Sequence, residues 1–590
     1  MTNRSKACIT ALTLFLTATA TAACAGGAAS PAPVAAAPPA PASAAPPASP
    51  PPGSVSGGSP AVAPPFAVLR DRALGELLED APENGRIVGL HEYDAKIPEL
   101  SRDAIAARVA RARKTRAELG ALDPRVLPAD DALDLAELRT ALDTELFWLD
   151  DMKSAEKRPS FYEPLFAVSA YIDVDYAPLE ERARRLVAHE EAALAQLPHV
   201  YENLVPPLSK PLTAVAARVY AGYATYLRGE VKAKLRGLGD AAFQARFARA
   251  NESLAAEAQK LSAFFAKESP RGDDSHVLGA ARFKRLVMVQ EGLDTPLADL
   301  VAMNEANLQA NKAAYEALAP KVKTTLLREA TALDVARTLV ARTRRFVLDK
   351  GLVTLASDDP VVVRETPPYA RTNGASIETS GPFDTAKSAY FNVTLPEPSM
   401  PAAERAEYLG TLGILAATTT HEAFPGHFVQ IRWNDRAPTR VQKILVSYSF
   451  SEGWAHYSEQ LMIDEGFGAD DPQNRLAQLQ DALLRNCRFA AAFGMHAGGM
   501  SLADAERRFV NDCHQPPPRA REQALRGTFD AWYFAYTLGK LQILALRDEA
   551  KARLGAKFNL RRFHDALLAH GTPPVALIRE RVLHDLESAP

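Results

Sequence analysis

Residues 418–427 of the chain read TTTHEAFPGH, and residues 451–459 read SEGWAHYSE. Each segment combines histidine with glutamate, side chains that bind metals and transfer protons in hydrolases. In the second segment Glu452, His456 and Glu459 stand at positions i, i+4 and i+7, so they share one face of a helix. The two segments therefore predict a pair of helices that carry a cluster of metal-ligating side chains.

The spacing of the two histidines in the first segment departs from the usual zinc helix. In an H-E-x-x-H helix, two histidines one turn apart bind the metal, and the glutamate between them takes a proton from water. Here five residues separate His421 from His427, and six positions of a regular helix rotate by about 600°, which does not return to the same face. Pro425 lacks a backbone N–H and clashes with the preceding turn. We therefore expect the helix to break or bulge there, in a way that turns His427 back towards His421.

The third ligand is expected from the second segment. Glu452 follows His427 by 25 residues, a separation like that in glutamate-ligated zinc peptidases. We predict one Zn²⁺ per chain, bound by His421, His427 and Glu452, with Glu422 as the general base. Glu459 is the alternative third ligand. The competing interpretation is a solvated helix face without a metal.

The rest of the chain predicts a mostly α-helical body. Apolar residues recur at spacings of three and four along seven segments, namely 100–119, 130–151, 179–197, 211–238, 240–267, 297–318 and 326–350. Strand signals are few, and the best lies at 388–395. We expect one large multi-helix domain over residues 66–590, zincin-like, with a groove and few short strands. Two lobes about that groove are an open alternative.

The first 65 residues predict export. A basic stretch, an apolar run and small residues before Cys24 are typical of a signal peptide over residues 1–23. Cys24 after two alanines fits lipid attachment, although ordinary cleavage to a secreted soluble form, with Cys24 an incidental thiol, is the alternative. Residues 24–65 are almost all Ala, Pro, Ser and Gly, which predicts a disordered tether. The protein is thus expected in the cell envelope, on the periplasmic or surface side.

Charge and hydropathy argue against nucleic acids as partners and against membrane-spanning segments. The formal net charge is −3, so the chain lacks the basic character of nucleic-acid-binding domains. No later segment is apolar enough to span a bilayer. Membrane contact is therefore expected only through an N-terminal lipid anchor, and the sequence predicts no particular oligomeric state.

Two cysteines lie in a predicted helical hairpin. One helix is expected over 476–497 and the next over 501–511, after a Gly-Gly break, with Ser501 as a helix cap. Cys487 and Cys513 flank this hairpin, and a disulfide is plausible in an oxidising compartment. Two unpaired buried thiols are the alternative.

The two central motifs resemble the bacterial "domain of unknown function 885" (DUF885) family, which is associated with zinc peptidases and often with lipoproteins. The likeness extends through most of the body, with similar stretches at 89–94, 536–547 and 563–571. Residues 530–533 depart from the family pattern. This departure puts in question how the chain contacts a substrate there, more than how it binds a metal. The family is in turn distantly similar to carboxypeptidase Taq, thimet oligopeptidase and angiotensin-converting enzyme. This resemblance implies a deep groove and hydrolysis of short peptides.

The resemblance also implies roles for further residues. Tyr536 fits a family tyrosine that would donate to the oxyanion, and His496 fits a position that would donate to substrate; a core tyrosine and a structural histidine are the competing interpretations. Two further interpretations rest on the residues themselves. Tyr390 and Asn392 would belong to an edge strand that pairs with an extended peptide, or to an amphipathic strand that packs in the body. Arg547 would hold a substrate C-terminus, or be an exposed or salt-bridged helix arginine.

Two other functions remain compatible with these residues. The metal centre would equally serve a hydrolase of a non-peptide amide or ester. A non-catalytic, metal-binding surface lipoprotein is the second alternative. Glu422 argues against it, because a structural metal site needs no general base.

Overall fold

The computed structural model describes residues 65–367, 374–397, 400–401, 405 and 408–588. The predicted signal peptide (1–23) and all but the last residue of the predicted tether (24–65) lie outside these residues. The described chain is mostly helical, as predicted, with three short strands in one small sheet. None of the described helices is long and apolar enough to cross a membrane.

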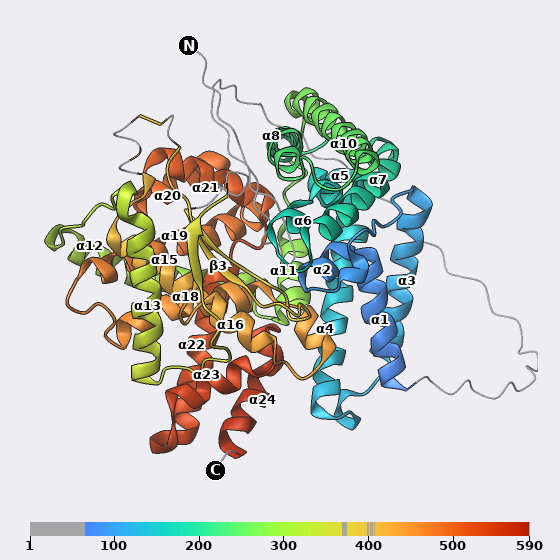
Figure 1. Ribbon diagram of the computed structural model, residues 1–590. Coiled ribbons are helices and arrows are strands. Elements are labelled where there is room, and N and C mark those ends of the chain that lie inside the picture. The colour runs from blue at the N-terminus through green and yellow to red at the C-terminus, as the bar shows by residue number, and fades with distance from the viewer. Residues whose placement is uncertain (1–64, 368–373, 398–399, 402–404, 406–407, 589–590) are drawn as a thin grey trace, which may run out of the picture.

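The helices form two groups that lie beside each other (Figure 1). We call residues 66–271 the N-terminal half and residues 280–588 the C-terminal half. The N-terminal half contains α1 (Phe66–Asp80), α2 (Pro82–Ile87), α3 (Arg102–Gly120), α4 (Ala129–Leu146), α5 (Ser154–Lys157), α6 (Ser169–Asp173), α7 (Leu179–Asn203), α8 (Lys210–Tyr226), α9 (Lys232–Lys234) and α10 (Ala241–Glu268).

The C-terminal half carries the two central motifs. Its helices are α11 (Ala280–Glu291), α12 (Leu297–Leu318), α13 (Ala332–Lys350), α15 (Leu412–Glu422), α16 (His427–Asn434), α17 (Arg440–Ile444), α18 (Tyr448–Asp464), α19 (Gln473–Ala497), α20 (Leu502–Asn511), α21 (Pro517–Phe529), α22 (Ala535–Leu554), α23 (Leu560–Leu568) and α24 (Val575–Ser588).

The predicted helices are confirmed, and their ends are set by local chemistry. In helix α10, for example, the Asp240 side chain caps the first turn by accepting a hydrogen bond from the N–H of Phe243. Its buried residues then recur along one stripe, which packs against α7 and α8. Helix α13 begins six residues later than predicted, because the N–H of Leu327 donates to the carbonyl of Gly410 (3.0 Å) in an extended segment.

The small sheet is made of β1 (Val362–Glu365), β2 (Ala375–Thr379) and β3 (Ala389–Val393), in the order β1-β3-β2. Strand β3 confirms the strand predicted at 388–395, and it pairs parallel with β1 and antiparallel with β2. Since β3 is central, the interpretation of Tyr390 and Asn392 as edge-strand residues is wrong. Both side chains contact Arg364: its Nε donates to Asn392 Oδ1 (2.7 Å), and its guanidinium lies 3.9 Å from the Tyr390 ring centre.

Helices α18 and α22 pack unusually closely against each other. A Cβ atom placed on Gly539 of α22 would lie 1.8 Å from the carbonyl oxygen of Ser449 on α18. A Cβ on Gly453 would lie 2.5 Å from the backbone of Gly539. Only glycine at both positions allows this contact, which holds the second motif against the core.

The predicted hairpin and disulfide are both present. Helices α19 and α20 are joined by a short turn, and Ser501 and Asp504 form a capping box at the start of α20. Cys487 and Cys513 are disulfide-bonded, with their Cα atoms 6.3 Å apart.

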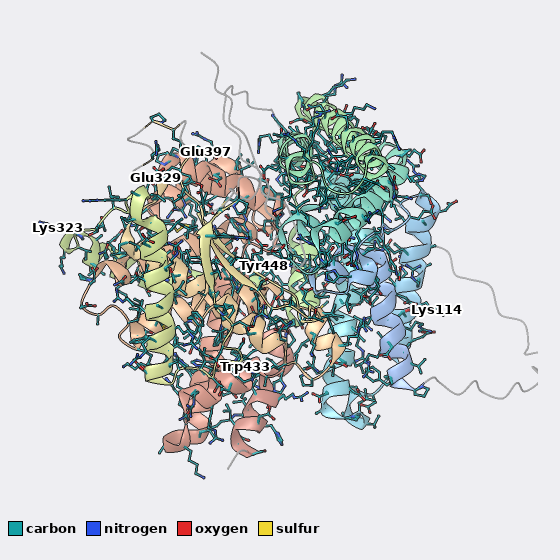
Figure 2. All side chains as sticks on the ribbon, viewed as in Figure 1. Lys114, Lys323, Glu329, Glu397, Trp433 and Tyr448 are labelled. Atoms are coloured by element: carbon teal, nitrogen blue, oxygen red, sulfur yellow. A yellow bond between two sulfur atoms is a disulfide. The ribbon has the colours of Figure 1, made fainter. Side chains whose placement is uncertain are left out.

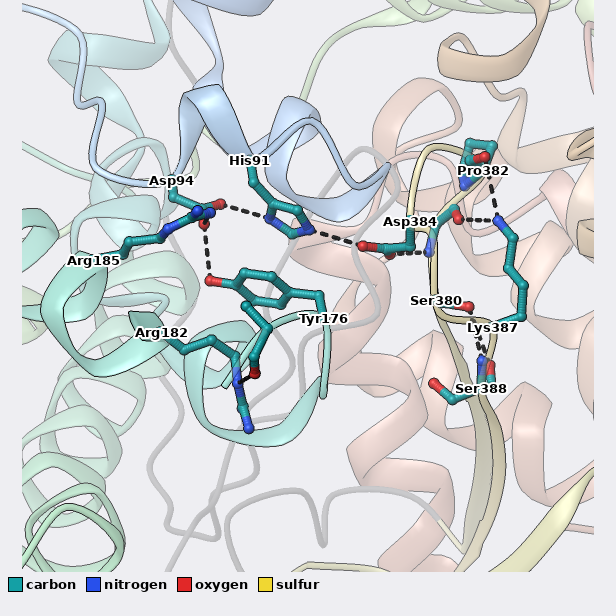
Figure 3. Close-up of polar contacts among 12 residues, drawn as sticks. His91, Asp94, Tyr176, Arg182, Arg185, Ser380, Pro382, Asp384, Lys387 and Ser388 are labelled. Atoms are coloured by element: carbon teal, nitrogen blue, oxygen red, sulfur yellow. Dashed lines mark hydrogen bonds and ion pairs between the residues drawn. The ribbon is translucent and has the colours of Figure 1, made fainter. Parts of the chain in front are cut away.

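A charged network joins the N-terminal half to the loop between β2 and β3 (Figure 3). The imidazole of His91 lies between two carboxylates: its Nε2 is 2.8 Å from Asp384 Oδ1 and its Nδ1 is 3.1 Å from Asp94 Oδ1. The ring stacks on Tyr176 at 3.7 Å, and both Tyr176 and Arg185 donate to Asp94 Oδ2 at 2.8 Å. Burial lowers the pKa of His91, but its bonds to Asp384 and Asp94 outweigh that effect and raise it to about 9. A protonated His91 therefore ties the two halves together beside the sheet.

Candidate metal centre

The first motif is interrupted where Pro425 predicted a break. Helix α15 ends at Glu422, and α16 begins at His427. Between them Gly426 passes so close to α15 that a Cβ atom there would lie 1.8 Å from the carbonyl oxygen of His421. The indole N–H of Trp454 donates to the carbonyl of Pro425 (2.8 Å) and so fixes the connection from α18. The chain thus re-enters a helix with His427 turned back towards His421, and the two ring centres are 4.7 Å apart.

The second motif places Glu452 opposite the two imidazoles. Its Oε2 lies 3.3 Å from His421 Nε2 and 3.6 Å from His427 Nε2. Two ligands that bind one zinc ion at about 2.0–2.1 Å in tetrahedral geometry lie about 3.3–3.4 Å apart. Glu452 Oε2 is also shielded from solvent, and its ion-pair partners among the described residues are these two imidazoles alone. A buried carboxylate is costly without a cation beside it. The three ligand atoms, all within 4.8 Å of one another, therefore fit a zinc ion.

Glu459 contacts the other side of the His421 ring. Its Oε1 lies 2.7 Å from His421 Nδ1, the nitrogen that faces away from Glu452, and 2.8 Å from Arg485 Nη2. Burial would raise the pKa of Glu459, but the Arg485 guanidinium and the hydrogen bond to His421 hold it far below its usual range. The geometry therefore favours Glu459 as the partner that orients His421 and Glu452 as the candidate ligand.

Glu422 is held by the edge of the sheet. The backbone N–H of Ile377 in β2 donates to Glu422 Oε2 at 3.0 Å, so this carboxylate oxygen is held in place. Burial raises the pKa of this carboxyl, although the neighbouring His421 and His427 act in the opposite direction. Ile377 lies 45 residues from Glu422 in the sequence, and no sequence pattern identified it.

His421, Glu422, His427 and Glu452 open into one cavity of about 1400 Å³ between the two halves. Its wall includes residues of both halves, in agreement with the predicted groove, and the site residues that line it are His421, Glu422, His427, Tyr448, Glu452 and Tyr536. Tyr448 lies near the centre of the molecule, where the two groups of helices meet (Figure 2).

Tyr536 lies in this cavity in a pair with Tyr448. The Tyr448 hydroxyl lies 2.9 Å from the Tyr536 hydroxyl, and Arg526 Nη2 donates to Tyr448 at 3.2 Å. Tyr448 was missed by the sequence analysis. It stands four residues before Glu452, so both project from one face of α18, and that spacing was the available signal.

Two further predicted residues lie away from the cavity. His496 is 1% exposed, and its Nε2 lies 2.9 Å from the carbonyl oxygen of Gly527. Its ring packs parallel to Phe283, and burial lowers its pKa to about 3. Arg547 donates to Tyr457 at 3.2 Å. Neither residue lines the cavity, so the structure does not bring His496 to a substrate-contacting position, nor Arg547 to a substrate C-terminus.

Residues 82–582 match the family described as "Bacterial protein of unknown function (DUF885)". This match covers most of the chain and includes both central motifs. The chain belongs to the DUF885 family. No curated protein matches it.

Two solved structures share the DUF885 chain's fold. One is described as a "putative lipoprotein of unknown function" from Shewanella oneidensis: it is 22% identical, has a TM-score of 0.74, and the match covers 88% of this chain and 100% of that one. The other is a "putative lipoprotein" from Colwellia psychrerythraea, 16% identical, with a TM-score of 0.72 and coverage of 89% and 99%. At these identities the likeness shows the fold alone.

Proposed function

We propose that the protein is a zinc-dependent peptidase that hydrolyses short peptides. The observation that carries this proposal is the position of Glu422 beside the His421–His427–Glu452 ligand set, in a single cavity. A structural zinc site is closed by four protein ligands, whereas three ligands leave a position for water or substrate.

The reaction needs a base, and Glu422 is placed to act as one. Zinc, when bound, would lower the pKa of a water molecule and polarise a carbonyl group. The free oxygen of Glu422 would take the proton of the attacking water and pass it to the leaving amine. Its other oxygen stays bonded to the Ile377 N–H, so the carboxylate does not rotate as the proton moves.

The tyrosine pair supplies a donor for the developing negative charge. Tyr448 stands one helical turn before Glu452, and its hydroxyl is bonded to that of Tyr536. Either phenol could donate to an oxyanion formed beside the metal, a contribution typically worth about 2.7–4 kcal/mol for one donor. Burial, together with the neighbouring Tyr536, raises the pKa of Tyr448 well above its usual value, which keeps the proton on the donor.

The cavity sets the size of the substrate. Its volume of about 1400 Å³ exceeds the roughly 300–1,000 Å³ of most small-molecule sites, and it lies between the two halves rather than on an open face. These features suit an extended peptide of a few residues, and they would exclude a folded protein.

A hydrolase of a non-peptide amide or ester is the second candidate, because the same ligands and base serve both bonds. A metal-binding lipoprotein without catalytic activity is the third, and the placement of Glu422 argues against it. A defined peptide library, digested with and without a chelator and beside simple esters and amides, tests all three. Chelator-sensitive peptide cleavage supports the first, ester cleavage alone the second, and zinc binding without any turnover the third.

The base has a test of its own. Glu422→Gln keeps an oxygen for the Ile377 N–H but cannot accept the proton, so the variant should retain zinc and lose about 10²–10⁴-fold in turnover. Glu522→Gln is the matched control, since Glu522 is an exposed residue on the cavity wall, and it should keep wild-type turnover. Wild-type turnover in Glu422→Gln would refute the assignment.

We also propose that the protein is exported and anchored by lipid at Cys24. Both structural relatives are described as lipoproteins, and residues 1–23 have the pattern of a signal peptide. Mass spectrometry of the mature N-terminus tests this. An unmodified Cys24, or a terminus at Ala23 or Ala25, would indicate a soluble secreted protein instead.

A further inference from the structure

Three arginines surround the tyrosine pair in the cavity. The guanidinium groups of Arg485 and Arg488 lie 5.7 and 5.0 Å from the ring centre of Tyr536, and Arg526 donates to Tyr448. Positive charges gathered in a partly enclosed space need anionic partners, because an unpaired charge removed from water is costly.

The chain itself neutralises two of the three. Arg485 pairs with Glu459 at 2.8 Å, and Asp481 lies 3.9 Å from it. Arg526 pairs with Asp530 at 3.0 Å. Both arginines are therefore engaged in holding the site.

Arg488 has no such partner. Its Nε donates to the neutral Oε1 of Gln523 at 2.9 Å. Within the described residues, no carboxylate oxygen lies within 4.0 Å of its guanidinium, and its two terminal nitrogens have no hydrogen-bond acceptor. The positive charge of Arg488 acts to lower the pKa of Asp530, but Asp530 is already paired with Arg526. Arg488 is partly buried and lines the cavity, so the N–H groups of its two terminal nitrogens are free to meet a ligand.

A short series of contacts connects Arg488 to the candidate metal ligands. Arg488 follows Arg485 by three residues on α19, a rise of about 4.5 Å along the helix. Arg485 in turn contacts Glu459, which holds His421. A group bound to Arg488 would therefore lie within a short peptide's reach of the bond to be cleaved.

We propose that Arg488 binds the C-terminal carboxylate of the substrate, so that the enzyme is a carboxypeptidase that releases one or a few C-terminal residues. This inference rests on the proposed function. A planar guanidinium matches a carboxylate with two parallel hydrogen bonds, and the bound carboxylate would supply the missing negative charge. Water adds to the carbonyl carbon of the scissile bond, the C–N bond breaks, and the leaving amine carries away a proton together with the fragment held at Arg488.

Arg519 is the competing anchor. It also lines the cavity and has no ion pair among the described residues, but it is exposed. Water neutralises an exposed charge, so a pair formed there would contribute little. Arg519→Met is therefore the matched control for Arg488→Met.

The test compares two peptides of identical sequence, one with a free C-terminal carboxylate and one with a C-terminal amide, with products read by mass spectrometry. We expect the wild-type enzyme to cleave the free acid about 10- to 100-fold more efficiently, as kcat/KM, and near its C-terminus. Arg488→Met should lower cleavage of the acid to the level of the amide, Arg488→Lys should lie between, and Arg519→Met should keep the wild-type preference.

The outcomes separate the two proposals. Equal cleavage of acid and amide by the wild-type enzyme would overturn the role of Arg488 while leaving a zinc peptidase in place. Loss of the preference for the free acid in Arg519→Met but not in Arg488→Met would assign the carboxylate-binding role to Arg519, and it would also overturn the role of Arg488. If the enzyme cleaves neither of these two peptides nor any other peptide of a defined library, the proposed peptidase function itself is refuted. The comparison of the two peptides with the wild-type enzyme needs no variant. It therefore tests the proposal even if Arg488→Met fails to fold.

Discussion

Replacement of Gly426 by alanine tests whether the break between α15 and α16 builds the metal site. The added Cβ would lie 1.8 Å from the carbonyl oxygen of His421, and real Cβ atoms essentially never come closer than 3.0 Å. The Cβ atom and the carbonyl oxygen would have to separate by about 1.2 Å. The carbonyl belongs to His421, the first predicted ligand, and Gly426 directly precedes His427, the second. Metal–ligand distances tolerate about ±0.2 Å.

The expected loss of zinc affinity is therefore large. Loss of a partner that only orients a ligand costs about 10–100-fold in affinity. A ligand displaced by more than 1 Å should cost more than that, because it no longer reaches the ion. The strain should also destabilise the fold by about 1–3 kcal/mol, as overpacking in a tight core does.

The assay is zinc content after dialysis against a graded zinc buffer, with thermal unfolding measured on the same samples. Gly75→Ala is the matched control: Gly75 lies within α1, and a Cβ there would meet nothing within 4 Å. That variant should keep its zinc and gain about 0.5–1 kcal/mol of stability from helix propensity. If Gly426→Ala bound zinc with wild-type affinity, the close approach of Gly426 to His421 could not be what positions the ligands.

Two further predictions concern the ligand helix and the contact between the halves. Glu452→Gln should empty the zinc site, whereas Glu459→Gln should weaken zinc binding only about 10–100-fold; the reverse order in a zinc titration would exchange the roles of the two glutamates. The pKa of His91 is raised to about 9 from about 6.5 in the unfolded chain, so the stability it contributes is fully present below about pH 6.5 and is lost as the pH rises to about 9. The difference in unfolding temperature between the wild-type protein and His91→Gln should accordingly shrink over that range, and a constant difference would exclude the charge on His91 as its source.

Much of the candidate site was predictable because the signals are local. The periodicity of apolar residues identified the helices, and the effect of Pro425 on its own turn predicted the break in the first motif. His421, His427 and Glu452 were predicted as ligands from residue type and spacing, and the structure brings the three side chains together. Cys487 and Cys513 could be paired as a possibility because a hairpin relates its two arms by a short turn.

The remainder depended on contacts between segments far apart in the chain. Ile377 and Glu422 are 45 residues apart, and Tyr448 and Tyr536 are 88 apart, so no local period relates them. His496 illustrates the reverse case: its motif fitted a functional position, but the packing of α19 turned it towards Phe283 and Gly527. The helices and the candidate metal ligands could be predicted from the amino-acid sequence, because helix periodicity and ligand chemistry act over a few residues. The packing of distant helices and strands was needed to show which carboxylate faces the two imidazoles, which backbone N–H holds Glu422 and that Arg488 lies in the cavity without a carboxylate partner. None of these contacts follows from residues that are neighbours in the sequence.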